Sequence, residues 1–195
     1  FQKDPAPVLQ LLERLKDDPE LYVRRSVANN LNDIGKDHPD LAAKVCARWS
    51  KGAPPGRLWI VKHALRSLLK QGHRGALQTL GYAGAPQVKL SKVRVPKCVS
   101  RGDTLRFSFQ IESTTDRKQR LLVDYAVHFV KADGATRPKV FKLRNLALGP
   151  RGRSEVTGRI SFKPMSTRQV YPGRHRLELL INGVARPLAG FELRP

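Results

Sequence analysis

Residues 25 to 36 combine basic, amide and acidic side chains at helical spacing. Arg25, Asn29 and Asp33 stand four residues apart, and Lys36 follows three residues after Asp33. Side chains at these spacings lie on one face of a helix. The apolar residues of the segment fall on another face, so we expect this stripe to meet solvent or a ligand. Guanidinium, ammonium and amide groups are typical partners of phosphate oxygens.

A second stripe of similar composition follows about 35 residues later. Its members lie three or four residues apart: Trp59, His63, Arg66 and Lys70. The apolar positions around the two stripes also repeat, because residues 23–27 and Leu31 recur as residues 61–65 and Leu69 at a constant offset of 38. Helix pairs that repeat at about 40 residues are typical of HEAT-like solenoids.

Equivalent helices of successive solenoid repeats line one concave surface. The two stripes therefore predict a groove for a phosphate backbone, with Asn29 and Asp33 reaching inward. Less specific interpretations stay open for each member. An Arg–Asp arrangement on a helix is commonly a solvated pair worth a few tenths of a kcal/mol. Asp33 could cap or pair within its own repeat, His63 could be a surface residue, and Trp59 could belong to the core.

Other chemistry-bearing patterns are missing from the sequence. Its five His and two Cys residues are scattered without the spacing of a zinc site, so we expect no metal. Neither a phosphate-binding glycine loop nor a serine-nucleophile elbow occurs. Two cysteines do not make a disulfide framework and are compatible with a reducing cytoplasm, which is the expected location. No apolar stretch approaches the length of a membrane-spanning helix.

The periodicity of the chain changes near its middle. Helical spacing predicts helices at 8–15, from Val23 to about Gly35, at 39–49 and from Leu58 to Gly72, and then a short helical turn at 75–80. From Gln87 onward apolar residues alternate with a period of two. Turn signals separate about seven strands at 88–95, 106–111, 121–130, 139–148, 155–162, 174–181 and 188–193.

These patterns predict an α + β chain of two domains. HEAT-like α-helical repeats occupy residues 1–85, and an immunoglobulin-like β-sandwich occupies residues 86–195. At least three helical repeats are normally needed for stability, and only two complete pairs occur. We therefore expect further repeats before Phe1; the alternative is that the sandwich caps the solenoid.

Charge narrows the choice of partner. The chain has 37 Lys and Arg against 16 Asp and Glu, and residues 86–195 alone hold 23 against 8. A compact domain this positive repels itself, so an anionic partner is expected, with nucleic acid as the first candidate. An anionic membrane surface is the rival, although no basic amphipathic helix with an aromatic face occurs. A protein that is merely basic is the third interpretation.

The segment 22–39, YVRRSVANNLNDIGKDHP, is distinctive. It resembles a repeat of the bacterial HEAT-like DNA alkylation repair glycosylases, the AlkC and AlkD group. Residues 59–81 are similar to the repeat that follows. A basic immunoglobulin-like domain after these repeats points to the AlkC type, since AlkD lacks that extension. The resemblance covers essentially the whole chain.

The resemblance implies a hydrolase of base excision repair. Such a DNA glycosylase removes cationic alkylated bases, such as 3-methyladenine, from double-stranded DNA and needs no cofactor. By motif match Asp33 is the expected catalytic carboxylate. The expected DNA-binding residues are Arg24, Arg25, Asn29, Asn30, Lys36, Lys62, His63, Arg66 and Lys70. The site of the family also uses residues of earlier repeats, so this chain, acting as a monomer, is expected to hold part of the catalytic centre. The alternative is a non-catalytic nucleic-acid-binding scaffold.

Overall fold

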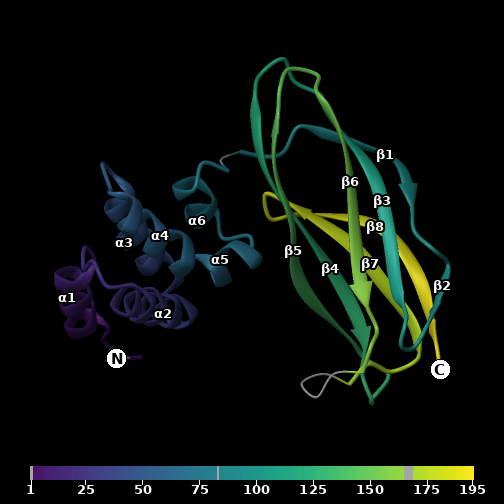
Figure 1. The fold of residues 1–195 in the computed structure, drawn as a ribbon, viewed down its shortest axis with the longest axis horizontal. Helices are drawn as coiled ribbons and strands as arrows, with labels where there is room; N and C mark the ends of the chain where they lie inside the picture. The colour runs from purple at the N-terminus through teal and green to yellow at the C-terminus, as the bar shows by residue number, and fades with distance from the viewer. Residues whose placement is uncertain (1, 83, 165–168) are drawn as a thin grey trace. The chain divides into compact units, whose positions relative to one another are not determined.

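A computed structural model describes residues 2–82, 84–164 and 169–195. The chain divides into two compact units, Phe1–Gly84 and Ala85–Pro195, and each is described by itself. The first is built of helices and the second of strands (Figure 1). None of the helices in the described ranges is long and apolar enough to cross a membrane.

The described part of the first unit contains six helices. They are α1 (Ala6–Leu15), α2 (Leu21–Asp37), α3 (Pro39–Ser50), α4 (Pro55–Ala64), α5 (Arg66–Lys70) and α6 (Arg74–Thr79). Helix α2 is central, because it contacts α1, α3, α4 and α5. Its predicted apolar stripe is the buried face: Val27, Leu31 and Ile34 are almost fully buried. This burial leaves the polar stripe of α2 on its outer face.

Helix α2 does not end near Gly35, as its sequence predicts, but continues to Asp37. Gly35 is buried inside the helix, and a Cβ atom added there would lie 3.3 Å from the Cβ atom of Ala42 in α3. This glycine thus allows two helices to approach closely, rather than ending the first one.

The prediction of one helix from Leu58 to Gly72 is also wrong. The structure has two helices in this segment, and the first begins before Leu58. The first, α4, starts at Pro55 and stops after Ala64, and the second, α5, starts at Arg66. Leu65 between them has φ −78° and ψ −1°, a turn conformation. The Arg66 guanidinium donates a hydrogen bond of 2.6 Å to the carbonyl oxygen of His63, which supports the turn. His63 and Arg66 consequently stand on different helices.

The described part of the second unit contains eight strands in two sheets. They are β1 (Val88–Arg94), β2 (Cys98–Ser100), β3 (Thr104–Ser113), β4 (Gln119–Val130), β5 (Thr136–Leu148), β6 (Arg153–Ser161), β7 (Gly173–Ile181) and β8 (Val184–Arg194). One sheet has the order β1-β3-β6, and the other has the order β2-β8-β7-β4-β5. The predicted immunoglobulin-like sandwich has one more strand than the seven expected. The additional strand, β2, is three residues long and pairs parallel to β8.

The two sheets enclose one apolar core. Phe107 of β3 meets Tyr125 of β4 edge to face, with ring centroids 5.3 Å apart. The Tyr125 hydroxyl donates a hydrogen bond of 3.0 Å to the carbonyl oxygen of Arg159 in β6, so it joins the sheets. Alternating residues of β3 point into this core, and those between them, including Arg106 and Ser108, stay on the outer face.

Candidate functional site

Asp33 lies on the outer face of α2 and is accessible. Half of its side chain, 51%, is exposed, and Oδ1 accepts an ion pair of 2.7 Å from Lys36 Nζ, one turn further along the same helix. Asp33 is therefore accessible from solvent. Lys36 is 60% exposed, so the ammonium group beside the carboxylate is also accessible.

Arg66 connects the two predicted stripes. Its guanidinium donates through Nη2 to Oδ1 of Asn29 at 3.0 Å, while Nη1 holds the carbonyl oxygen of His63. The contact joins α5 to α2, two segments 37 residues apart in sequence. Arg25, one turn before Asn29, lies close enough to act on the charge of His63. The structure thus brings Arg25, Asn29, His63 and Arg66 together.

Trp59 and His63 form a stacked pair on α4. Their ring centroids lie 4.9 Å apart and the planes differ by 10°. Burial lowers the pKa of His63 below its usual 6.5, and the charges of Arg66 and Arg25 lower it further. The imidazole is neutral at pH 7, so it offers this site a flat ring rather than a positive charge. Trp59 also packs against the helical core, but it is only partly buried.

Four other predicted residues do not join this cluster. Arg24 donates to the carbonyl oxygen of Pro19 at 2.7 Å, and Asn30 donates to that of Ser26 at 3.0 Å. The side chains of Lys62 and Lys70 are exposed. Neither side chain forms a hydrogen bond or an ion pair with the residues that the structure describes.

Tyr22 is a candidate that the sequence analysis missed. It is 84% exposed, which is unusual for so large an aromatic side chain. It lies three residues before Arg25 and seven before Asn29, so it shares their face of α2. That spacing was the available signal. An exposed ring on a polar stripe is suited to stacking on a nucleobase.

Over the residues that the structure describes, no group of three or more His, Cys, Asp or Glu side chains is arranged to hold a metal ion.

Comparison with known proteins identifies the family. Residues 89–195 match the family model described as the C-terminal Ig-like domain of the uncharacterised protein YhaZ. The chain is 44% identical over 194 residues to YhaZ of Bacillus subtilis (strain 168), covering 99% of this chain and 54% of that protein. A solved structure of the Pseudomonas fluorescens alkylpurine DNA glycosylase AlkC, bound to DNA containing an abasic site analog, matches with a TM-score of 0.96. Its identity is 42%, over 100% of this chain and 54% of AlkC.

The chain belongs to the YhaZ family and is an AlkC-type protein. This confirms the resemblance found from residues 22–39 and the immunoglobulin-like assignment of the second unit. The AlkC-type chain spans about half the length of both relatives, 54% in each case. Because the likeness to AlkC covers both units, it applies to the stripe on α2 as well as to the sandwich.

Proposed function

We propose that the chain forms part of an alkylpurine DNA glycosylase, which removes cationic alkylated bases such as 3-methyladenine from double-stranded DNA. The observation that carries this proposal is the likeness over the whole chain to AlkC, with a TM-score of 0.96 and 42% identity. The carboxylate of Asp33 also supports the proposal, because it is accessible and stands at the position that the motif match assigns to catalysis.

Asp33 would act on the sugar rather than on the base. A positively charged base is already a good leaving group, so breaking its N-glycosidic bond needs no strong general acid. The remaining barrier is the positive charge that develops on the sugar, which a nearby carboxylate stabilises while it orients the attacking water. Lys36 holds Oδ1 of Asp33, which leaves Oδ2 to face the sugar or the water.

The basic and amide side chains around Asp33 would hold the DNA strand. Arg25, Asn29, His63 and Arg66 form one cluster beside the carboxylate-bearing face, and Lys62 and Lys70 would add charges that reach phosphates. Arg24 and Asn30 have local hydrogen bonds in the free chain. They would exchange these bonds for contacts to the strand.

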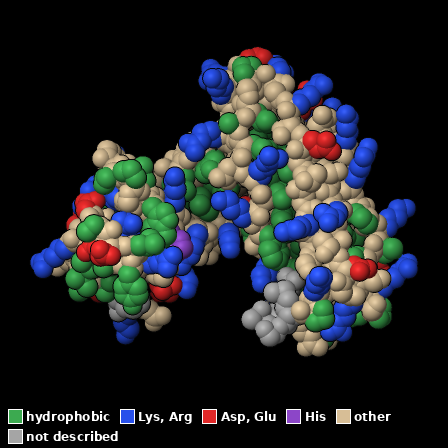
Figure 2. All heavy atoms as spheres, in the orientation of Figure 1, with side chains coloured by type: hydrophobic (Ala, Val, Ile, Leu, Met, Phe, Trp, Pro, Cys, Tyr) green, Lys and Arg blue, Asp and Glu red, His purple; other side chains and the backbone are tan. Residues whose placement is uncertain are grey.

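The protein would act in base excision repair as a monomer in the bacterial cytoplasm, and each of the two units would have its own role. The helical unit would be the end of a HEAT-like solenoid, whose earlier repeats complete the active site in the longer protein. The sandwich would grip the duplex, since residues 86–195 hold 23 Lys and Arg against 8 Asp and Glu, and blue side chains outnumber red ones on the face that Figure 2 shows. Such a grip is largely independent of sequence, because it depends on phosphates.

A base-release assay with the full-length protein tests the proposed function. Incubation with methylated duplex DNA should release free 3-methyladenine and leave abasic sites, which chromatography of the supernatant and alkaline strand cleavage detect. The scaffold alternative predicts binding to the same duplex with base release no faster than in buffer.

A further inference from the structure

The outer face of the β1-β3-β6 sheet changes in charge along its length. Near one end Arg153 lies opposite Glu112, and the two side chains form an ion pair of 3.0 Å. Two rows further along, Thr157 lies opposite Ser108, so neither strand carries a charge there. In the next row Arg159 lies directly opposite Arg106. The row between Arg153 and Thr157 pairs Gln110 with Glu155, and the uncharged Thr104 and Ser161 form the row beyond Arg106 and Arg159. The two like charges thus lie two rows from the nearest carboxylate of this face.

Like charges directly opposite each other destabilise an antiparallel pair of strands. A third arginine, Arg94 at the end of β1, lies opposite Ser108 and belongs to the same face. All three arginines are exposed. Among the ion pairs between described residues, none contains Arg94, Arg106 or Arg159, whereas Arg151 and Arg153 both have a carboxylate partner. The group is therefore a local excess of positive charge that the fold does not compensate.

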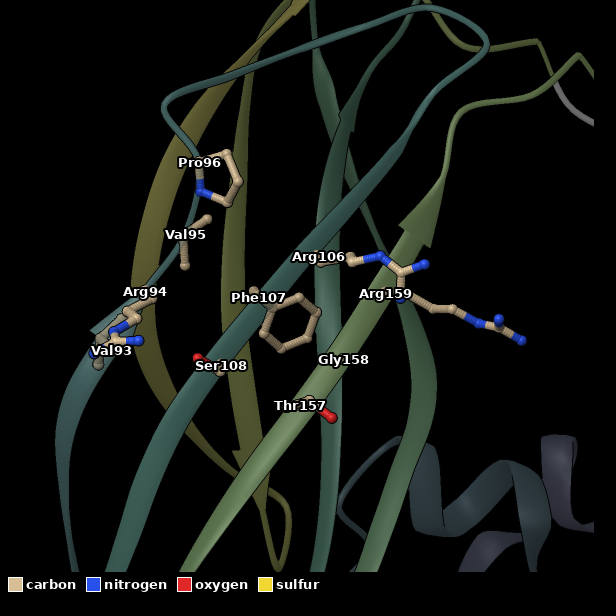
Figure 3. Close-up of a pocket in the computed structure, with 10 residues that line it drawn as sticks. All are labelled: Val93, Arg94, Val95, Pro96, Arg106, Phe107, Ser108, Thr157, Gly158 and Arg159. Carbon is tan, nitrogen blue, oxygen red and sulfur yellow. The ribbon is translucent and has the colours of Figure 1, made fainter.

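A recess of about 870 Å³ is lined by these three arginines together with apolar residues of the segment 93–96. It forms where β1 leaves its regular pairing with β3, between Ser91 and Arg94, and Lys92 in that bulge has φ +49°. The exposed hydroxyl of Thr157 and the partly exposed hydroxyl of Ser108 also line it. Figure 3 shows Arg106 and Arg159 extending in the same direction from their neighbouring strands.

The backbone beneath the recess is fixed by the core. A Cβ atom on Gly158 would lie 2.2 Å from Cζ of Phe107, so the ring occupies the space that a side chain would need. On the next residue, the carbonyl oxygen of Arg159 is held by the Tyr125 hydroxyl. Arg106 and Arg159 thus project from an anchored pair of strands, which lowers the entropic cost of holding a ligand between them.

We propose that this recess binds the phosphate backbone of a DNA strand, with Arg94, Arg106 and Arg159 on the phosphate oxygens and the hydroxyls of Ser108 and Thr157 as additional donors. Planar guanidinium groups pair with phosphate in a bidentate geometry, and serine and threonine hydroxyls are frequent phosphate contacts. An anion between Arg106 and Arg159 removes the repulsion that their pairing otherwise causes. The inference rests on the proposed function only in taking DNA as the partner, and not on any catalytic step.

The test compares two double variants of equal charge in the full chain. R106Q/R159Q removes the uncompensated pair, and R151Q/R153Q removes two arginines that already have carboxylate partners. Fluorescence anisotropy with a labelled duplex, at several salt concentrations, gives the affinity and its salt dependence. We expect R106Q/R159Q to weaken binding about tenfold or more and to lower the slope of log K against log [salt] by about one to two, since each phosphate contact contributes about 0.9.

The control variant should lose less than about threefold in affinity. Equal losses of affinity in both variants would mean that only the total charge matters. No loss of affinity in R106Q/R159Q would mean that DNA does not bind in the recess. Either result overturns the proposal. Thermal unfolding of both variants checks that the sandwich stays folded. R106K/R159K, which keeps the charge but not the planar fork, should recover only part of the affinity.

Two further arms identify the ligand. At equal ionic strength, inorganic phosphate should displace the duplex no better than chloride does, because a backbone presents several phosphates to the three arginines together. Displacement by phosphate alone would make this a site for a free anion and overturn the assignment. The anisotropy measurement contains no catalytic step, and the control R151Q/R153Q should leave the rate of base release by the full-length protein unchanged. Failure of the glycosylase proposal would therefore leave the binding result standing.

Discussion

The basic residues near Asp33 differ in the contacts that hold their side chains. Lys36 is paired with Asp33, Arg66 is bonded to Asn29 and to the His63 carbonyl, and Arg24 is bonded to Pro19. An arginine held in this way loses little side-chain freedom on binding. Arg66 is therefore suited to fixing the position of a strand, whereas the exposed Lys62 and Lys70 are suited to attracting it electrostatically.

A buried histidine gives the sandwich a dependence on pH. His175 has no exposed surface and stacks on Phe191, with ring centroids 5.4 Å apart. Nδ1 accepts a hydrogen bond from the Val130 amide, and Nε2 faces the Tyr171 carbonyl at 3.1 Å, which suits the neutral ring. Burial lowers the pKa of His175 below 6.5, and the Tyr171 carbonyl opposes only part of that effect.

The unfolded chain therefore takes up a proton more readily than the folded one. The free energy of unfolding should fall as the pH decreases below about 6.5, by up to about 1.4 kcal/mol per pH unit for one proton. Urea unfolding, followed by the amide NMR signals of β4 and β7 between pH 5 and 8, measures this dependence. His175→Gln should flatten it, and His38→Gln in the helical unit should not. An unchanged slope in His175→Gln would assign the effect to another group.

At the scale of elements, the junction of β3 and β6 depends on a glycine. Gly158 has no room for a Cβ atom, because the buried Phe107 ring lies against it. Gly158→Ala should lower the free energy of unfolding by about 1–3 kcal/mol, as overpacking of a core does. Gly149→Ala is the matched control, since no atom lies within 4 Å of its added Cβ. Chemical denaturation of both variants decides the point, and equal stabilities would mean that Phe107 moves aside without cost.

Local periodicity predicted most elements, because apolar spacing reports which face of a helix or strand is buried. The stripe of Val27, Leu31 and Ile34 and the alternation in β3 are both found in the structure. Where the prediction was wrong, a contact from another element decided the outcome. Gly35 lies inside α2, where its lack of a Cβ atom lets Ala42 of α3 approach, and β2 forms by pairing with β8.

The candidate site was predictable to the extent that it lies on one helix. Arg25, Asn29 and Asp33 share a face of α2 because of their spacing alone. The bond between Asn29 and Arg66 needs the packing of α2 against α5, and the recess at Arg106 and Arg159 needs the register of β3 and β6. Neither is encoded in a local pattern. Tyr22 was missed although its spacing places it on the same face as Arg25, because only the structure shows that its ring is exposed.

At the scale of the whole molecule, the sandwich should supply much of the electrostatic attraction to DNA. Residues 86–195 carry 23 Lys and Arg against 8 Asp and Glu. Deleting them from the full-length protein should weaken duplex binding sharply and flatten its salt dependence, because fewer counterions are released. Titrations of a labelled duplex at several salt concentrations measure both quantities. Affinity and slope that stay unchanged after the deletion would refute a gripping role for the sandwich.

The central claim is that Asp33 takes part in breaking the glycosidic bond, and a single comparison tests it most directly. Asp33→Asn and Asp37→Asn make the same charge change on α2 of the full-length protein. Single-turnover base release from methylated duplex and duplex affinity are measured for both. We expect Asp33→Asn to slow base release about 100-fold or more while affinity changes less than about threefold, since a group that stabilises developing charge acts mainly in the transition state. Asp37→Asn should change neither. Equal losses of rate and affinity in Asp33→Asn, or an undiminished rate, would contradict the claim.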